Sequence, residues 1–481
     1  MTNFMAVFGA ALAVNCLVTF RSSDYWKKFA TGGQAVVEKE DAAQKKLWES
    51  LLKKYLIVYL LATLSDWLQG PYVYALYSDY KYSQHDIAVL FVAGFGSSMV
   101  FGSFIGGMAD WGGRRLFIVV FALIYAASCL TKHFKNFNVL MLGRLLGGIA
   151  TSLLFSVFEA WLIRAHADAG LKQYIGRSFS WAAYCNSIVA ISAGLVANSA
   201  AESFPMRAVK EETVYIGGYL NPFDIALCAL VVCGLAVVSL WEENYGEDNE
   251  SDAKNGGGAW YDGLRSAFVT TIRSTDILLC GIISSLFEGS MYIFVFMWTP
   301  ALREDKEDLP FGLIFSTFMV SCMAGSSLFS VLIEHVKGEK LAVFIFAFAS
   351  VAMGLVALSS SQLLKFIAML CFEATVGMYW PVMGTLKGAI VPESKRAAIY
   401  NLYRIPLNFI VLFSLLTDLT PTQSFTLNCV MLATAAILQA ILMTRRQKHG
   451  LMEAETSPTD EAKEALLSSP SEKKDDDHDV V

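Results

Sequence analysis

Long apolar stretches with almost no charge dominate this chain and constrain what it can fold into. Each has about the 20 residues that a helix needs to cross a bilayer, and a backbone in lipid must satisfy its own hydrogen bonds, as an α-helix does. They make the chain 55% hydrophobic and only 17% charged, against about 45–50% and about 25% in soluble domains. The sequence therefore predicts an all-α membrane protein. The thirteen predicted spans are residues 4–20, 54–76, 86–107, 115–132, 138–163, 178–199, 222–241, 276–301, 311–334, 340–359, 362–386, 396–416 and 424–443.

The first of these stretches, residues 4–20, has two interpretations. A cleaved signal peptide has a basic region, then an apolar core, then small residues at the cleavage site. No Lys or Arg precedes the apolar core here. We therefore expect the stretch to be retained as an additional helix in front of twelve core helices.

The distribution of Lys and Arg predicts the orientation of the spans. In multispanning proteins these residues are more frequent in the short loops on the cytoplasmic side. They are concentrated between residues 21 and 53, in the loop at 106–115, in the segment 242–275 and after residue 443. We expect these segments in the cytoplasm and the N-terminus outside.

A polar segment at 242–275, with three consecutive glycines, separates six core spans from the next six. The tripeptide Phe-Glu-Ala occurs at 158–160 and again at 372–374, an offset of 214 residues, and Gln69-Gly70 is echoed by Glu288-Gly289 at an offset of 219. Two matches at nearly one offset indicate a duplicated half. The expected parts are an additional helix with a basic cytoplasmic segment (1–53), an N-terminal six-helix bundle (54–241), a cytoplasmic linker (242–275), a C-terminal six-helix bundle (276–443) and a disordered cytoplasmic tail (444–481).

The sequence carries no recognisable signal for catalysis or for metal binding. The nine cysteines lie in or beside apolar stretches and form no C-x-x-C pair, and no hydrolase or nucleotide-binding motif occurs. We therefore expect no enzymatic activity, no cofactor, no metal site and no nucleic-acid partner. The lipid bilayer is the expected surrounding, and a monomer the expected functional unit.

The loop between the second and third core helices carries a distinctive motif. Residues 106–115 read GGMADWGGRR, and this G-x-x-A-D-x-x-G-R-R pattern resembles the corresponding loop of major facilitator superfamily transporters. The resemblance implies a major facilitator fold of two six-helix halves, here with the additional N-terminal helix, and transport of a small solute between the halves. It also implies that Asp110, Arg114 and Arg115 form a gating latch at the cytoplasmic helix ends.

Six ionisable side chains lie inside predicted spans. At the bilayer centre each costs at least about 2.5–3.5 kcal/mol on insertion scales, so each requires a functional or structural reason. Five of them fall on core helices 1, 4, 7 and 10, counted from residue 54, which in the superfamily line the central cavity. The pattern indicates a polar translocation path. The six are Asp66, Arg144, Glu159, Glu288, Glu373 and Arg404.

Arg404 is the first candidate ligand for an anion, because a guanidinium group donates paired, charge-assisted hydrogen bonds to an oxyanion. The alternative is a structural ion pair with Glu373 or Asp66. Arg144 begins an R-x-x-x-G motif that resembles one in the fourth helix of the family, for which a packing role is favoured. Helical spacing places polar neighbours beside these charges. The candidate substrate-binding residues are Arg404, Arg144, Gln69, Asn401, Asn408 and Tyr292.

Three carboxylic acids, Asp66, Glu288 and Glu373, are candidates for proton coupling, since a carboxyl group buried away from water can titrate near neutral pH. The alternative is that they only neutralise the arginines. Glu159 lies near the cytoplasmic end of its helix. We assign it to gating, together with the latch residues.

Distinctive sequences occur in six blocks of the predicted spans: residues 65–74 (SDWLQGPYVY), 143–156 (GRLLGGIATSLLFS), 158–161 (FEAW), 285–292 (SLFEGSMY), 296–300 (FMWTP) and 403–408 (YRIPLN). They are similar to the eukaryotic molybdate-anion transporter branch of the superfamily, which also has an additional leading helix. The resemblance implies uptake of molybdate, a tetrahedral dianion. The charges by themselves would equally suit sulfate or an organic anion.

Three classes of function stay open at this point. The first is secondary active import of molybdate or a similar oxyanion by alternating access, with proton coupling undecided. The second is transport of another solute, such as sulfate, an organic anion or a sugar, on the same fold. The third is a non-transporting sensor or scaffold. The sequence holds no recognised sorting signal, so the plasma membrane is the default location of this multi-pass protein.

Overall fold

The computed structural model describes residues 2–22, 42–102, 104–210, 213–246, 259–303, 309–392 and 395–456. Helices account for nearly all of this part of the chain, and the one described sheet is a short antiparallel hairpin. In the hairpin Arg207 pairs with Ile216 and Ala208 with Tyr215, and a bulge precedes the pair of Lys210 and Val214.

The first half of the chain begins with one separate helix and continues with six core spans. The elements are α1 (Thr2–Ser22), α3 (Ala42–Gln69), η1 (Gly70–Tyr72), α4 (Val73–Asp79), α5 (Gln84–Gly102), α6 (Ile105–Gly112), α7 (Arg114–Thr131), α8 (Phe137–Asp168), η2 (Lys172–Tyr174), α9 (Ile175–Ser203), β1 (Arg207–Lys210), β2 (Val214–Ile216), η3 (Gly218–Leu220) and α10 (Asn221–Leu240).

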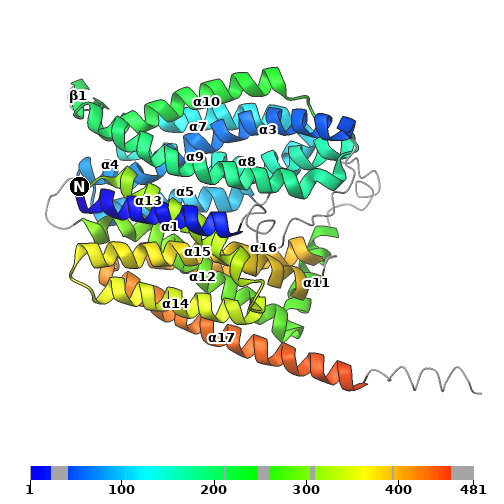
Figure 1. Ribbon diagram of the computed structural model, residues 1–481. Coiled ribbons are helices and arrows are strands. Elements are labelled where there is room, and N and C mark those ends of the chain that lie inside the picture. The colour runs from blue at the N-terminus through cyan, green and yellow to red at the C-terminus, as the bar shows by residue number, and fades with distance from the viewer. Residues whose placement is uncertain are drawn as a thin grey trace, which may run out of the picture.

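The second half repeats the arrangement of six core spans after a helix in the linker. Its elements are α11 (Ala259–Arg273), α12 (Thr275–Leu302), α13 (Phe311–Leu332), α14 (Gly338–Leu358), α15 (Gln362–Ile390), α16 (Arg396–Leu416) and α17 (Pro421–Thr456). Figure 1 shows the two bundles side by side, with all long helices roughly parallel. We call the two ends of the molecule the β1 end and the α11 end, after elements labelled in that view.

The structure confirms the all-α architecture predicted from the apolar stretches. Eleven described helices, α1 among them, are long and apolar enough to cross a membrane. The other two predicted spans also form helices. Residues 54–76 lie in α3, η1 and α4, where Gly70 and Pro71 interrupt the α-helix because proline cannot donate the helical backbone hydrogen bond. Residues 396–416 form α16, whose apolar part is Leu402–Leu416.

The additional helix α1 packs on the second half of the chain, against α13 (Figure 1). The ring of Phe4 meets that of Phe366 in α15, with centroids 5.1 Å apart. Near the other end of α1, the Thr19 hydroxyl lies 3.0 Å from the Ser327 hydroxyl of α13. Apolar and polar contacts thus attach α1 along its length to the C-terminal bundle.

Helix also occupies part of each of the three segments expected to lie outside the two bundles. α3 begins at Ala42, ahead of residue 54; α11 forms inside the linker; and α17 continues past residue 443 to Thr456. In α17 the extension is held by ion pairs of Arg445 with Asp276 (3.1 Å) and of Arg446 with Glu339 (2.8 Å). Residues 457–481 of the expected tail lie outside the described residues.

The two bundles meet where α9 packs against α13 and α5 against α16. At the first contact two glycines allow the backbones to approach closely, since a Cβ on Gly312 would lie 2.2 Å from the Gly194 carbonyl oxygen and 2.7 Å from the Asn198 nitrogen. Real Cβ atoms do not come this near to backbone atoms, so any side chain at Gly312 would force the bundles apart.

Replacing Gly312 with alanine should therefore destabilise the protein, by about 1–3 kcal/mol as for other overpacked sites. The readout is the unfolding midpoint of the purified protein in detergent. Gly384→Ala is the matched control, because no atom lies within 4 Å of a Cβ there. Equal midpoints for the two variants would show that the α9–α13 approach is not a tight constraint.

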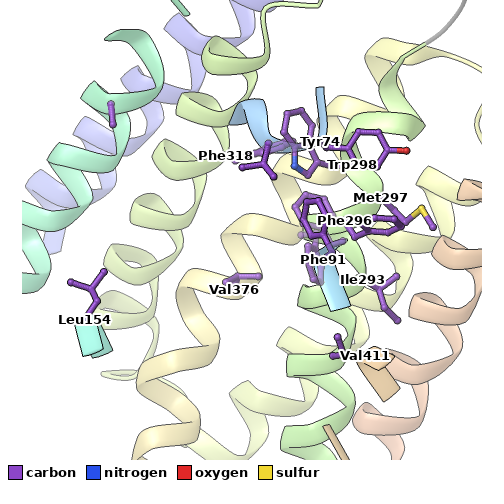
Figure 2. Packing of buried hydrophobic residues seen from close by; sticks show 14 of the residues in the cluster. Tyr74, Phe91, Leu154, Ile293, Phe296, Met297, Trp298, Phe318, Val376 and Val411 are labelled. Carbon is purple, nitrogen blue, oxygen red and sulfur yellow. The ribbon is translucent and has the colours of Figure 1, made fainter. Parts of the chain in front are cut away.

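Aromatic side chains close the space between the bundles toward the β1 end. The Phe296 ring of α12 lies 5.5 Å from the Tyr74 ring and 5.2 Å from the Phe91 ring of the first half, measured between centroids, and Figure 2 shows the three together. Beyond them, Arg303 donates to the Ser78 hydroxyl (2.9 Å), and His85 Nδ1 lies 2.9 Å from Asp418. These contacts join the two bundles at the β1 end.

An ion pair at the β1 end predicts a pH-dependent stability. Asp224 accepts a hydrogen bond from His133 Nε2 (2.9 Å), and the Tyr215 carbonyl lies 2.9 Å from Nδ1. The Asp224 hydrogen bond is the main cause that raises the pKa of His133 above its ordinary 6.5. The charged imidazolium can donate to both acceptors. The ion pair therefore stabilises the folded protein fully at pH values below the ordinary pKa of His133. This stabilisation is lost as the pH rises through the raised pKa of His133 in the folded protein.

We expect wild type to unfold at a higher temperature than Asp224→Asn at about pH 6, with a smaller difference at about pH 9. The measurement is the unfolding midpoint in detergent at both pH values, and His133→Gln is the control in which the Asp224 carboxylate has lost its partner at every pH. A difference that does not change with pH would mean that His133 is not charged in the folded protein.

Candidate functional site

The charged side chains inside the spans form two separate clusters, and two carboxyl groups, Glu373 and Glu159, lie outside them. The larger cluster belongs to the C-terminal bundle and the smaller to the N-terminal bundle.

Glu288 is the centre of the larger cluster. It extends from α12 toward α15, where Tyr379 donates its hydroxyl proton to Oε1 (2.7 Å) and Lys387 Nζ donates to the same oxygen (3.0 Å). The Tyr379 ring is fully buried and is stacked on Phe287 with centroids 4.1 Å apart, which fixes its direction. The side chains of Lys387 and Glu288 are 17% and 19% exposed. Lys387 and Glu288 thus form a largely desolvated ion pair, and the Glu288 carboxylate accepts a second hydrogen bond from Tyr379.

Arg404 is exposed in α16, well inside the helix. It forms no ion pair or hydrogen bond with another described side chain, so the expected alternatives of a pair with Glu373 or Asp66 are not realised in this structure. One turn earlier lies Tyr400, whose ring centroid is 5.8 Å from Lys387 Nζ. Residues four apart share a helix face, so Arg404 and Lys387 border the same face of α16.

Tyr292 connects this cluster to the other bundle. Its ring meets the Phe95 ring of α5 edge to face, with centroids 5.1 Å apart, and its hydroxyl is within electrostatic range of both Glu288 and Arg404. Asn408 is half-buried one turn beyond Arg404. The side chain of Asn401 lies outside the described residues.

The smaller cluster lies in the N-terminal bundle around Asp66. The Tyr125 hydroxyl of α7 donates a short hydrogen bond to Asp66 Oδ1. Arg144 is close enough to Asp66 to interact electrostatically, but its Nε donates to the Leu90 carbonyl (3.2 Å) and its guanidinium covers the Phe91 ring at 4.6 Å from the centroid. Arg144 is thus packed against α5, in line with the packing role favoured from its motif.

Gln69 is directed back to its own helix. The side chain is only 4% exposed, and its amide nitrogen donates to the Ser65 carbonyl (2.9 Å). In this arrangement one amide N–H of Gln69 is used within its own helix. A substrate role for Gln69 would require the side chain to leave this hydrogen bond.

Glu373 is an isolated carboxyl group. It lies in α15, 7% exposed, near Cys322 of α13. No hydrogen bond or ion pair joins it to another described residue. The helices α13 and α15 pack tightly here, because a Cβ on Gly377 would lie 1.9 Å from the Cys322 carbonyl oxygen. A buried carboxylate without a partner is costly to ionise.

The latch residues lie at the α11 end and are tied together within the first half. Arg114 pairs with Asp110 (2.6 Å) and donates to the Ala160 carbonyl, two turns before the end of α8 (3.2 Å). Arg115 donates from its backbone nitrogen to Glu243 Oε1 (2.7 Å) and from its side chain to the Val238 carbonyl (2.7 Å). The loop therefore joins α7, α8 and α10. No described contact of these residues reaches the C-terminal bundle.

Glu159 is exposed on α8, on the side of the latch, and forms no ion pair with a described residue. Phe155, one turn earlier, is 71% exposed, and Trp380 of α15 is 53% exposed. The hydrogen bonds and ring contacts between the bundles among the described residues lie toward the β1 end or in the middle. The two bundles are thus joined at the β1 end and not by the gating residues at the α11 end.

Sequence reasoning missed Lys387, Glu243 and the two tyrosines that hold the carboxylates. Lys387 directly follows the predicted span 362–386 and resembles an interfacial lysine. Its long stem brings the ammonium group back to Glu288, a placement that only the packing of α15 on α12 reveals. Glu243 lies in the linker, yet its carboxylate accepts from the first backbone nitrogens of α7, which is a usual way to satisfy a helix N-terminus.

Comparison with known proteins identifies the family of this chain. A family of sugar transporters with twelve transmembrane segments matches residues 29–368 of the chain. The molybdate-anion transporter of Takifugu rubripes is 34% identical over 387 residues, covering 75% of this chain and 78% of that protein. The chain belongs to the molybdate-anion transporter family of the major facilitator superfamily. The molybdate-anion transporter of Xenopus tropicalis is also 34% identical, over 395 residues, with 80% of this chain and 82% of that protein covered.

Solved structures show the same fold. The nucleoside transporter NupG superposes with a TM-score of 0.60 at 13% identity, covering 82% of this chain and 98% of that one. The D-xylose-proton symporter has a TM-score of 0.59 at 13% identity, covering 81% and 95%. These proteins are transporters and not enzymes, and the chain is a multi-pass membrane protein of the major facilitator superfamily.

Proposed function

We propose that this protein transports molybdate or a similar oxyanion across a membrane, with Arg404 as the principal ligand. The observation that carries the proposal is the exposed Arg404 guanidinium, which lies inside the span α16 and has no partner among the described side chains. An unpaired charge at this depth is costly and usually marks a substrate path. A tetrahedral dianion would supply the missing charge and accept paired hydrogen bonds. The names of the curated relatives support molybdate as that dianion.

Lys387 is the second cation of the proposed site. Both it and Arg404 border one face of α16, and Glu288 neutralises Lys387 in this structure. An oxyanion bound beside Arg404 would compete with Glu288 for the ammonium group. Asn408 and Tyr292 could donate further hydrogen bonds. Arg144 and Gln69 are already hydrogen-bonded within the first half, which favours a supporting role for both.

We further propose transport by alternating access. The contacts of Phe296, Arg303 and His85 would close the β1 end in the present state and separate in another. Positive charge on the loops predicts that the α11 end faces the cytoplasm. The present state would then be open toward the cytoplasm and ready to release its substrate there. The latch of Asp110, Arg114 and Arg115, with Glu159, would meet the C-terminal bundle when that end closes.

Proton coupling is proposed for Glu373 first. Its carboxyl group is buried without a partner among the described residues, so a proton would remove the cost of a lone charge. Glu288 and Asp66 each accept a hydrogen bond from a tyrosine hydroxyl. Glu288 also pairs with Lys387, so a charged carboxylate that serves as counter-ion to this lysine is the role that its contacts favour. If Glu373 carries the proton, Glu373→Gln should transport at a rate that no longer depends on pH.

The decisive experiment is molybdate uptake by cells that express the protein, compared with cells that do not. Sulfate and a neutral sugar are added as competitors, and uptake is measured at two external pH values. Saturable uptake that sulfate reduces and sugar does not would support the oxyanion assignment, and faster uptake at acidic pH would support proton coupling. Uptake that is reduced by the sugar and not by sulfate would favour a sugar as the substrate, as the description of the matching family suggests.

If the protein reaches the membrane and moves no molybdate above background, the substrate assignment fails. The remaining functions would then be transport of another solute, or a sensor or scaffold that keeps its partner when Arg404 is removed. The plasma membrane and a monomeric state are part of the proposal, and tagged protein localised in cells and sized in detergent tests both.

A further inference from the structure

The linker helix α11 borders an open pocket that lies outside the proposed transport site. The pocket has a volume of about 350 Å³ at the α11 end of the molecule. Five of its lining residues come from α11 and one from the segment just before α16. They are Arg265, Ser266, Val269, Thr270, Arg273 and Lys395.

The lining is basic and rich in hydrogen-bond donors. It contains three cations and two hydroxyl groups, and no acidic residue among those described lines the pocket. Lys395 Nζ donates to the Thr270 hydroxyl (2.9 Å), which fixes the ammonium group at the rim. Arg265 and Arg273 are exposed and form no ion pair with a described residue. Two guanidinium groups and an ammonium around one hollow suit a phosphate group.

The rest of α11 has the properties of a helix that lies at a membrane surface. Ala267 and Thr271 are buried and pack the helix against the protein. On the adjacent rows Phe268 and Ile272 are 54% and 56% exposed. A helix with basic residues on one side and exposed large apolar residues on the next binds at the interface between headgroups and acyl chains. α11 contacts α12 and α16, so its surroundings are the ends of membrane spans (Figure 1).

We propose that this pocket binds the headgroup of an anionic phospholipid from the leaflet at the α11 end. The phosphate would lie between Arg265, Arg273 and Lys395, and the acyl chains would lie along Phe268 and Ile272. A soluble phosphate would use only the charges and would leave those two apolar side chains in water. The bound lipid would anchor the linker between the two bundles to the membrane. This inference does not depend on which solute the protein transports.

The test measures retained lipid and not transport, so its failure is separate from that of the proposed function. The full-length protein is equilibrated in detergent micelles containing phosphatidylcholine with increasing phosphatidylinositol 4-phosphate, and bound lipid is counted by native mass spectrometry. Wild type is compared with Arg265→Gln/Arg273→Gln. The matched control is Lys337→Gln/Lys340→Gln, which removes two exposed cations outside the pocket.

We expect the pocket variant to bind the anionic lipid roughly 30-fold more weakly than wild type, since each basic residue near a membrane surface contributes about a fivefold factor in affinity. The control variant and Arg265→Lys/Arg273→Lys should bind nearly as well as wild type. Equal binding by wild type and the pocket variant would overturn the proposal. Displacement of the lipid by millimolar inorganic phosphate or molybdate would also overturn it, because the pocket would then be a site for soluble anions.

Discussion

Replacing Arg404 with alanine is expected to reduce molybdate uptake by about 10- to 100-fold. The range corresponds to the net loss of one charge-assisted hydrogen bond, worth about 1.5–3 kcal/mol. The described residues offer the substrate no second unpaired guanidinium at this site. Arg404→Lys should keep part of the activity, since it keeps the charge and loses the planar fork. Uptake is measured at several molybdate concentrations in cells and normalised to the amount of protein at the membrane.

The same substitution should leave the fold intact. Arg404 is exposed and has no partner among the described residues, so alanine there should not lower the unfolding midpoint. Arg207→Ala, which removes an exposed arginine of the β1 hairpin, is the matched control and should transport like wild type. Full uptake by Arg404→Ala would exclude Arg404 as the ligand and direct attention to Lys387.

Breaking the pair of Lys387 and Glu288 should affect both stability and transport. The pair is less than one-fifth exposed on either side, and removing one partner of such a pair leaves an uncompensated charge at a cost on the order of 3 kcal/mol. Lys387→Ala and Glu288→Ala should each lower the unfolding midpoint by several degrees. The neutral pair Lys387→Met/Glu288→Gln should recover much of this loss, because no lone charge remains and Tyr379 can still donate to the amide oxygen.

Transport separates a structural role of this pair from a substrate role. If Lys387 binds the oxyanion, the neutral double variant should be stable and still require a higher molybdate concentration for half-maximal uptake. If the pair only holds α12 and α15 together, the double variant should transport normally. Lys340→Ala removes an exposed lysine and is the control for the loss of one lysine charge; its uptake and unfolding midpoint should match those of wild type. Unchanged stability in both single variants would show that the ion pair contributes little.

Much of this architecture could be predicted from the sequence, because the signals are local. An apolar stretch of about 20 residues predicts a span whatever its neighbours are, and the described residues of all thirteen predicted spans are largely helical, those of α1 included. The charges within those stretches were equally visible, and the motif at 106–115 indicated the superfamily. The motif around Arg144 predicts a packing role, and its guanidinium lies over the Phe91 ring; its role in transport stays a prediction.

Other sequence signals were weaker than they looked. The repeated Phe-Glu-Ala does not mark equivalent places, since Glu159 lies far along α8 and is exposed, whereas Glu373 lies near the middle of α15 and is buried. Three identical residues are too few to define a register between two helices. The sequence predicts only a polar linker where the amphipathic helix α11 forms, because glycines and acids surround its apolar residues.

The sequence by itself determined which segments enter the membrane, which charges go with them and which family the chain resembles. Only the tertiary structure decided that Lys387 reaches Glu288, that Arg404 is left without a partner among the described residues, that α1 packs on the C-terminal bundle and that the bundles are joined at the β1 end. The transfer of a helix into lipid depends on the sum of its own side chains. Ion pairs and closure depend on where helices about one hundred to more than two hundred residues apart come to lie, and that placement is set by packing.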